Sequence, residues 1–292
     1  MNILTFDIEE WYLEKVKGGE VEEKFRTFDD ILSQILDMLD AKEEKATFFC
    51  VGKMGCEFPD VVRKIYKRGH EIGCHSNVHT WLNKMTEEEC RQDTREAMDS
   101  LEQCVGEKVV SYRAPAFSIG ENNKWAFEIL AEFGIEKDSS VYPSTRDFGG
   151  FPNFGSNSPS LISYNGITLK EYPISMTTIM GKRMAYSGGG YFRFFPLWFV
   201  RGQMKKSDYN MLYFHIEDIL AESSRPMSKL EYETYFKENG TLLARYKRFV
   251  KANLGKKNAF EKLQKLINKD DYVNLKQADS HMDWHAVPHI SL

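Results

Sequence analysis

Residues 45–75, "KATFFCVGKMGCEFPDVVRKIYKRGHEIGCH", contain two short apolar runs on either side of a helical pattern. The first run, 45–52, is rich in β-forming residues and closes at a glycine, which predicts a strand. Residues 59–69 have proline at the start and glycine at the end, the usual limits of a helix. Residues 70–75 predict the next strand. The segment is therefore predicted to be a strand–helix–strand unit with parallel strands.

The same alternation continues on both sides of this unit. Strand patterns occur at 2–8 and 109–112, the latter ending in a proline-stiffened loop, and helical patterns occur at 28–42, 86–106 and 123–134. The helix at 28–42 opens with an Asp-rich N-cap signal, and the helix at 86–106 opens with a capping box. Strands that alternate with helices of ten or more residues predict an α/β fold, either an open parallel sheet or a barrel.

Composition excludes several classes of protein. The chain has 292 residues, a formal net charge of −4 and a pI of about 6.0, so it has no general attraction to nucleic acid or anionic membranes. No apolar run reaches the roughly 18 residues of a membrane span. The first residues lack the pattern of a signal peptide, and the five cysteines form no CxxC pair. We therefore expect a cytoplasmic protein with free thiols.

Unusual polar residues follow three of the predicted strands. They are found in "DIEE" (7–10), "GCHSNVH" (73–79) and "YRAPAF" (112–117). Because functional sites of parallel α/β folds lie at the carboxyl ends of the strands, this shared placement predicts a site. His75 and His79 are either two metal ligands or two ordinary surface histidines.

A hydrolytic metal site commonly has three protein ligands and an open position for water. His75 and His79 supply two, and an acidic residue from "DIEE" is a candidate for the third. Asp7 and Glu9 point to the same side of an extended strand, so one can bind a metal while the other remains a general base. The alternative is an ordinary acidic strand end.

Two further candidates lie at the ends of predicted strands. Arg113 is either a surface residue in a proline loop or a guanidinium that orients a catalytic carboxylate and favours its charged form. His215 ends the apolar run "NMLYFH" (210–215). A histidine titrates near neutrality, so His215 is a candidate general acid, with a core histidine as the alternative.

Seven segments occur in an order that resembles the polysaccharide deacetylase family, carbohydrate esterase family four with its NodB-homology domain. The likeness is greatest to the bacterial branch associated with exopolysaccharide and surface-glycan synthesis, and it extends over about three quarters of the chain. The segments are "TFDIEEW" (5–11), "ATFFCVG" (46–52), "GHEIGCHSNVH" (69–79), "YRAPAFSI" (112–119), "DSSVYP" (138–143), "SGGGYFRFFP" (187–196) and "YFHIED" (213–218).

The resemblance implies a NodB-like fold, a distorted (β/α) barrel of parallel strands with fewer than eight full units. It also implies roles for named residues: His75 and His79 as metal ligands, Asp7 as catalytic base, Arg113 as the residue that holds the base, and His215 as catalytic acid.

The third metal ligand is where this chain departs from the common family pattern of two adjacent aspartates. Asp7 is followed by Ile8, Glu9 and Glu10. Members with an acidic-x-acidic version use the third position, which favours Glu9 and leaves Glu10 as the alternative. The expected ion is zinc, with cobalt and nickel as alternatives.

The implied substrate is an N-acetylated glycan or glycan precursor. A backbone N–H near Ala116 is expected to stabilise the oxyanion. Tyr142, Tyr191 and Trp81 are candidate sugar-stacking surfaces, with core packing as the alternative. "DSS" (138–140) either places a carboxylate near the site or turns the chain, and the structural role is favoured.

The resemblance thus predicts a metal-dependent hydrolase that removes an N-acetyl group from a sugar of a bacterial polysaccharide or precursor. The alternatives are hydrolysis of another non-peptide amide on the same fold, and a catalytically silent glycan-binding barrel. Neither a nucleic-acid partner nor a transmembrane segment is expected, and the sequence gives no oligomeric state.

The predicted domain organisation divides the chain at residue 225. Residues 1–225 are expected to form the catalytic domain, including a loop-rich insert at 144–200 that is rich in Gly, Pro, Ser and Asn in its first part. Residues 226–292 are expected to be a helical extension packed on the same domain. The segment 228–268 reads as helical with a basic, solvated outer face.

Overall fold

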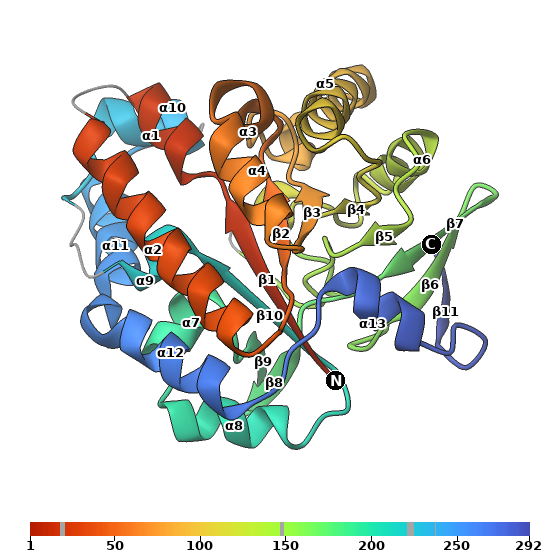
Figure 1. The fold of residues 1–292 in the computed structure, drawn as a ribbon. Coiled ribbons are helices and arrows are strands. Elements are labelled where there is room, and N and C mark those ends of the chain that lie inside the picture. The colour runs from red at the N-terminus through yellow and green to blue at the C-terminus, as the bar shows by residue number, and fades with distance from the viewer. Residues whose placement is uncertain (18–20, 147–148, 221–224, 237) are drawn as a thin grey trace.

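The fold is a mostly parallel sheet surrounded by helices (Figure 1). The computed structural model describes residues 1–292 except 18–20, 147–148, 221–224 and 237. The nine hydrogen-bonded strands lie in the order β10-β1-β2-β3-β4-β5-β7-β6-β11. All run parallel except β6 and β11, which run opposite to the rest. This confirms the predicted α/β class with parallel strands.

The strands are short, as the sequence patterns predict. Their bounds are β1 Asn2–Ile8, β2 Thr47–Cys50, β3 Glu71–Cys74, β4 Ser111–Tyr112, β5 Lys137–Asp138, β6 Ser160–Tyr164, β7 Ile167–Glu171, β8 Met176–Ile179, β9 Lys182–Ala185, β10 Asn210–His215 and β11 His289–Ser291. The strands β8 and β9 form a separate antiparallel pair.

The helices connect and cover these strands. Their bounds are α1 Glu10–Lys17, α2 Glu22–Ala41, α3 Gly52–Glu57, α4 Pro59–Lys67, α5 Glu87–Val105, α6 Trp125–Glu132, α7 Gly189–Phe194, α8 Leu197–Met204, α9 Ile216–Ile219, α10 Lys229–Phe236, α11 Leu242–Asn253, α12 Ala259–Lys269 and α13 Leu275–His281. Among the described residues, none of these helices combines the length and the apolar composition that a membrane crossing requires.

Alternate residues of β1 and β10 belong to two different apolar cores. In β1, Leu4 and Phe6 pack with the surrounding helices, whereas Ile3 packs with residues inside the curved sheet. In β10, Leu212 and Phe214 likewise pack with the surrounding helices, and Met211 packs with the residues inside the curved sheet. Because successive side chains of a strand point to opposite faces, Asp7 shares the inner side with Ile3.

The curved sheet is not closed into a complete barrel by backbone hydrogen bonds between described strands. Side-chain hydrogen bonds join the chain after β7 to β10 instead. Ser175 Oγ accepts from the Met211 amide at 2.7 Å, and the Tyr209 hydroxyl donates to the Pro173 carbonyl at 2.7 Å. These contacts link the segment after β7 to β10, while the backbone hydrogen bonding of the sheet stays open.

Two local predictions were wrong. The helix α2 begins at Glu22 and not at the Asp-rich segment, because Phe25 and Phe28 continue its apolar face toward the N-terminus and Phe28 is buried. The insert at 144–200 is not loop-rich throughout, since from residue 160 it contains four strands and two helices. Asn165 and Gly166, both with positive φ, form the tight turn between β6 and β7.

The last part of the chain returns to the N-terminal strands. Val273 pairs with Ile3, and the Leu275 amide donates to Thr47 Oγ1 at 2.8 Å. The helix α13 adds Leu275 and Ala278 to the inner core. The predicted boundary at residue 225 directly follows 221–224, which lie outside the described residues, and the two-part division stays a prediction.

Candidate metal and catalytic centre

The predicted site residues meet at the carboxyl ends of the first strands. Asp7 in β1 lies directly opposite His215 in β10, because these parallel strands pair residue by residue from Asn2 to Asp7. Glu9 follows β1, His75 follows β3, and Arg113 follows β4. A single edge of the sheet therefore brings together residues that are up to 208 positions apart in sequence.

Glu9, His75 and His79 form a cluster of three donor groups. One ligand atom from each lies within 4.8 Å of the others. Oε2 of Glu9 is 2.6 Å from Nε2 of His79 and 3.4 Å from Nε2 of His75. Oε2 is also buried and makes no hydrogen bond of acceptable geometry within the described part of the chain. Two imidazole nitrogens and one carboxylate are the donor set of many mononuclear hydrolytic metal sites.

The hydrogen bonding of His75 supports the fit of a cation to this cluster. Nδ1 of His75 lies 2.7 Å from the Arg113 carbonyl oxygen, which can only accept, so Nδ1 carries the proton. In the neutral ring Nε2 then presents a lone pair toward the Glu9 carboxylate. A backbone carbonyl that fixes the tautomer in this way is the common outer partner of a metal-binding histidine. A cation between these facing lone pairs satisfies all three donors.

The electrostatics of Glu9 agree with this placement. Burial opposes the charge of Glu9, but its contacts with His79 and His75 prevail and hold the pKa of Glu9 well below its usual range. The carboxylate is therefore charged at neutral pH and available as a ligand.

The loop between the two histidines has a constrained backbone. Ser76 and His79 both have positive φ, 61° and 60°, which is uncommon for residues with a side chain. Ser76 Oγ accepts from the His79 amide at 3.0 Å, and Asp93 Oδ2 in α5 accepts from the Asn77 amide at 2.8 Å. These bonds hold the two imidazoles at their spacing without a helix.

Arg113 is fully buried inside the curved sheet, where it contacts residues of β1, β2 and β10. Its Nη1 donates to Asp7 Oδ1 at 2.8 Å and to Thr5 Oγ1 at 2.8 Å, and its Nη2 donates to Ser139 Oγ at 3.0 Å. The guanidinium lies 4.2 Å from the ring centroid of Phe49. The surface alternative for Arg113 is therefore wrong, because the side chain is fully buried. Within the described residues, its ion-pair partner is the carboxylate of Asp7.

A glycine makes room for this packing. Gly73 in β3 faces the Phe49 ring so closely that a Cβ at Gly73 would lie 2.5 Å from it. A side chain at residue 73 would therefore displace the ring on which the Arg113 guanidinium lies.

His215 is held between two carboxylates. Its Nε2 lies 3.6 Å from Asp7 Oδ2, and its Nδ1 lies 2.8 Å from Asp218 Oδ2. Burial opposes the charged imidazole, but the hydrogen bond and charge of Asp218, with Glu9 and Asp7 adding to them, raise the pKa of His215 well above its ordinary value.

Asp218 and Arg193 are site residues that the sequence reasoning missed. Arg193 in α7 pairs with Oδ1 of Asp218 and leaves Oδ2 to His215. Burial raises the pKa of Asp218, but His215 and Arg193 outweigh it, so the net shift is downward. The spacing His215–Asp218 within "YFHIED" was the available signal, since the helix α9 brings the two side chains together.

Glu10, the alternative third ligand, points elsewhere. Its Oε1 accepts from the Glu217 amide at 3.1 Å, and its Oε2 from the Glu9 amide at 3.2 Å. Burial, with the neighbouring charge of Glu9, raises the pKa of Glu10 to about 8. Of the two glutamates, only Glu9 lies in the three-residue cluster.

The predicted substrate-binding residues differ in exposure. Ala116 is half-buried and has a positive φ of 54° in the turn Pro115–Phe117. Tyr191 is half-buried at the inner core. Tyr142 is buried, with its hydroxyl accepting from the Ala185 amide at 3.3 Å, and Trp81 is buried against Phe236. Packing, the alternative reading, describes Tyr142 and Trp81 in this structure.

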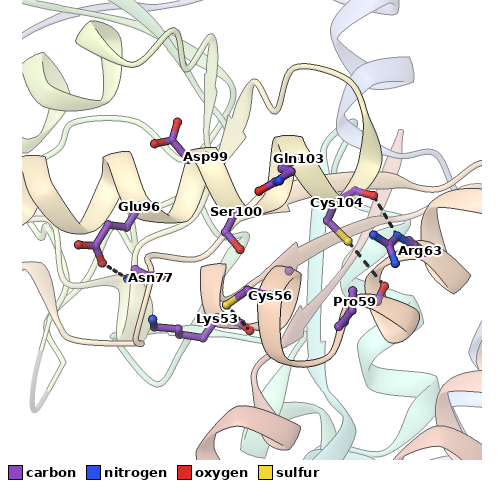
Figure 2. Close-up of a pocket in the computed structure, with 11 residues that line it drawn as sticks. Lys53, Cys56, Pro59, Arg63, Asn77, Glu96, Asp99, Ser100, Gln103 and Cys104 are labelled. Carbon is purple, nitrogen blue, oxygen red and sulfur yellow. Dashed lines mark hydrogen bonds between the residues drawn. The ribbon is translucent and has the colours of Figure 1, made fainter.

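A separate cavity of about 620 Å³ lies on the outer side of the sheet, between α3, α4 and α5 (Figure 2). Its lining includes Lys53 from α3, Arg63 from α4 and Ser100 from α5. Among the described residues that line it, none is a predicted site residue. Asn77 borders the cavity and donates to Glu96 at 2.6 Å, so the cavity adjoins the loop that carries the two histidines.

Two family models match the chain in sequence. Residues 19–137 match the polysaccharide deacetylase model, and residues 139–279 match a domain of unknown function, DUF3473. The first match includes His75, His79 and Arg113, and the second includes His215.

Two relatives that match the chain in sequence are named as deacetylases, in agreement with the first family model. A peptidoglycan-N-acetylglucosamine deacetylase of Bacillus cereus is 37% identical over 108 residues, which is 35% of this chain and 39% of the relative. A peptidoglycan-N-acetylmuramic acid deacetylase of Bacillus subtilis is 30% identical over 100 residues, 32% of this chain and 21% of the relative. The chain thus spans well under half the length of these two relatives.

The fold has a solved counterpart along nearly the whole chain. The crystal structure of a Mycobacterium smegmatis protein named as a polysaccharide deacetylase superposes with a TM-score of 0.64 at 19% identity. The superposition covers 99% of this chain and 92% of the other. Residues 19–137 are thus similar in sequence to the polysaccharide deacetylase family, and the chain shares its fold with this solved protein.

Proposed function

We propose that this chain is a metal-dependent de-N-acetylase that acts on an N-acetylated hexosamine of a bacterial polysaccharide or its precursor. The observation that carries the proposal is the position of the Glu9, His75 and His79 cluster beside the Asp7–His215 pair. A metal site alone serves many reactions, but a carboxylate and a charged imidazole beside it supply the base and the acid that amide hydrolysis needs.

The cluster fits a single divalent ion, and the ion that we propose is zinc. When bound, such an ion supplies Lewis-acid polarisation of a carbonyl oxygen and lowers the pKa of water. Glu9, His75 and His79 are the proposed ligands.

The remaining residues divide the proton transfers between them. Arg113 occupies Oδ1 of Asp7, which leaves Oδ2 to remove a proton from the attacking water. The new bond joins the water oxygen to the acetyl carbon, and the carbon–nitrogen bond then breaks. His215 donates its Nε2 proton to the departing nitrogen, so the products are acetate and a free amine. A backbone N–H near Ala116 is proposed to stabilise the oxyanion.

Acetate release is the direct test of the proposed function. The purified chain, loaded with one equivalent of Zn²⁺, is expected to release acetate from chito-oligosaccharides or from N-acetylated peptidoglycan fragments, and to lose this activity after chelation. Re-addition of Zn²⁺ or Co²⁺ should restore it. Full activity in the chelated protein would reject the proposal in favour of a metal-free amidohydrolase. Stoichiometric metal binding without acetate release from any N-acetylated glycan would favour the silent barrel.

The substitution Asp218→Asn is expected to shift the pH profile of kcat/KM. A general acid must be protonated, so activity falls as pH rises through the pKa of His215. Because Asp218 raises that pKa, its loss should move the alkaline limb to lower pH and leave the acidic limb in place. The control Asp208→Asn, at an exposed position, should keep the parent profile. An unchanged alkaline limb in Asp218→Asn would show that His215 is not the acid.

The cytoplasmic location expected from the sequence stays a prediction. The same holds for the absence of a nucleic-acid partner.

A further inference from the structure

The helix α11 exposes large apolar residues to solvent, whereas a helix that covers a protein core buries them. Five large apolar residues in and just after α11 are 51–65% exposed, and the helix has no buried residue. They are Leu242, Leu243, Tyr246, Val250 and Leu254. At 3.6 residues per turn, the spacing of four residues places most of them along one stripe.

The arginines of α11 point toward the protein instead. Arg245 donates to the Met227 carbonyl at 2.9 Å, and Arg248 donates to the Tyr232 hydroxyl at 2.8 Å. The Arg248 guanidinium also lies 3.7 Å from the ring centroid of Phe236. A helix on the surface of a globular protein normally buries its apolar stripe and exposes its charges. In α11 the polarity of the two faces is reversed.

The charged residues in the segment that contains the stripe have one sign, although Glu238 before it pairs with Arg248. From Leu242 to Phe260 the chain has six Lys and Arg residues and no Asp or Glu, although the whole chain has a net charge of −4. Lys247 and Lys257 are exposed. The overall charge gives no general attraction to anionic membranes, but this local concentration of positive charge complements an anionic surface.

We propose that α11 docks on the surface of an anionic phospholipid bilayer. An exposed apolar stripe with an aromatic residue, flanked by lysines, is the arrangement of helices that lie in the interfacial plane of a membrane. The aliphatic side chains enter the acyl boundary, and the lysines contact the phosphate groups. A protein partner or a second copy of this chain needs acidic groups to match the exposed lysines, and between Leu242 and Phe260 this chain itself has none.

The docking helix is tied to the candidate catalytic centre at both ends. Before α11, Phe236 of α10 packs on Trp81, two residues after His79, with ring centroids 6.2 Å apart. At its other end, the carbonyls of Lys251 in the last turn and of Leu254 just after it accept from Arg193, the residue that also pairs with Asp218. Figure 1 shows α11 at the outer edge of the molecule.

A consequence for the substrate rests on the proposed function. A deacetylase that docks through α11 takes its N-acetyl groups from a glycan held at the membrane surface, such as a lipid-linked one.

Vesicle co-sedimentation of the full chain tests the docking surface. The protein is expected to sediment with vesicles of phosphatidylcholine mixed with phosphatidylglycerol, and much less with phosphatidylcholine alone. The double substitution Lys247→Glu/Lys257→Glu and the double substitution Leu243→Ser/Val250→Ser should each weaken partitioning at least about tenfold. High salt should weaken the binding of the parent protein.

Matched controls make the same kinds of change, charge reversal and loss of an apolar side chain, at exposed positions outside α11. Lys205→Glu/Lys206→Glu reverses two exposed charges after α8, and Met180→Ser removes an exposed apolar side chain between β8 and β9. Both controls should bind vesicles as the parent does. Thermal unfolding and zinc stoichiometry, which require no activity, verify that each variant is folded.

Three results would overturn the docking proposal. They are failure of the parent protein to bind anionic vesicles, equal binding by the α11 variants and their controls, and a dimer by light scattering that Leu243→Ser/Val250→Ser converts to a monomer. The last result would assign the face to a second copy of the chain. Because sedimentation needs no turnover, a chain that binds vesicles but releases no acetate would reject the proposed function alone.

The membrane-held substrate is tested separately, by acetate release. An N-acetylglucosamine glycolipid in anionic vesicles should be deacetylated more slowly by the α11 variants, whereas soluble chito-oligosaccharides should be deacetylated at the parent rate. Equal slowing on both substrates would contradict the substrate inference.

Discussion

Asp7→Asn is expected to retain the metal ion and to lose turnover by about 10²–10⁴-fold, the usual contribution of a general base. The amide keeps the shape of the carboxylate and still presents an oxygen to Arg113, but it cannot take a proton. Steady-state acetate release and metal content, measured on the same preparation, separate the two effects. The expected loss is in kcat, with little change in the amount of bound Zn²⁺.

The position of Asp7 makes the result of this substitution informative in either direction. Oδ1 accepts from Arg113, and Oδ2 faces His215, so neither oxygen belongs to the cluster of Glu9 and the two histidines. If Asp7→Asn emptied the metal site, Asp7 would be a ligand and the base would have to be another group. The control is Asp208→Asn, an exposed carboxylate far from Asp7 in sequence, which should be fully active.

His79→Ala is expected to lose both the metal ion and activity, the latter by about 10³-fold or more. His79 lies on a loop outside the strands, and its Nε2 contacts Glu9, so its removal deletes one of the three donors without opening the core. Metal content by mass spectrometry and acetate release are the two measurements. Thermal unfolding of the metal-free proteins should differ little between parent and variant.

A matched histidine substitution gives the comparison for His79→Ala. His285 is exposed near the C-terminus, so His285→Ala should keep one ion per chain and the parent activity. Retention of one tightly bound ion by His79→Ala, with normal turnover, would contradict the assignment of the cluster as the metal site.

Elements with a strong local signal could be predicted from the sequence. The capping box at the start of α5 is present, since Thr86 Oγ1 accepts from the Glu89 amide and the Glu89 carboxylate accepts from the Thr86 amide. The strands β1 and β10 could be predicted from their apolar runs. The helix α4 could be predicted from the proline at its start and the glycine after its end. In each case the signal lies within the element itself.

Features that depend on distant contacts could not be predicted in the same way. Arg113 turns inward because Thr5, Asp7 and Ser139, from two other parts of the chain, provide its partners. The two candidates Glu9 and Glu10 are adjacent in sequence and chemically alike. The Glu217 amide, more than two hundred residues away, and the Glu9 amide bind the Glu10 carboxylate outside the cluster. The exposure of the apolar face of α11 could likewise not be predicted, because sequence periodicity does not show which face of a helix contacts the rest of the protein.

The pairing of β1 with β10 has a consequence for how the centre is assembled during synthesis. The ribosome makes all three proposed metal ligands within the first 79 residues, but His215 follows more than a hundred residues later. At roughly 5–20 residues per second, this interval is on the order of 10 s. The strand β10 supplies both a parallel neighbour of β1 and the proposed acid, His215. The three proposed metal ligands are therefore synthesised well before the proposed catalytic pair of Asp7 and His215 is complete.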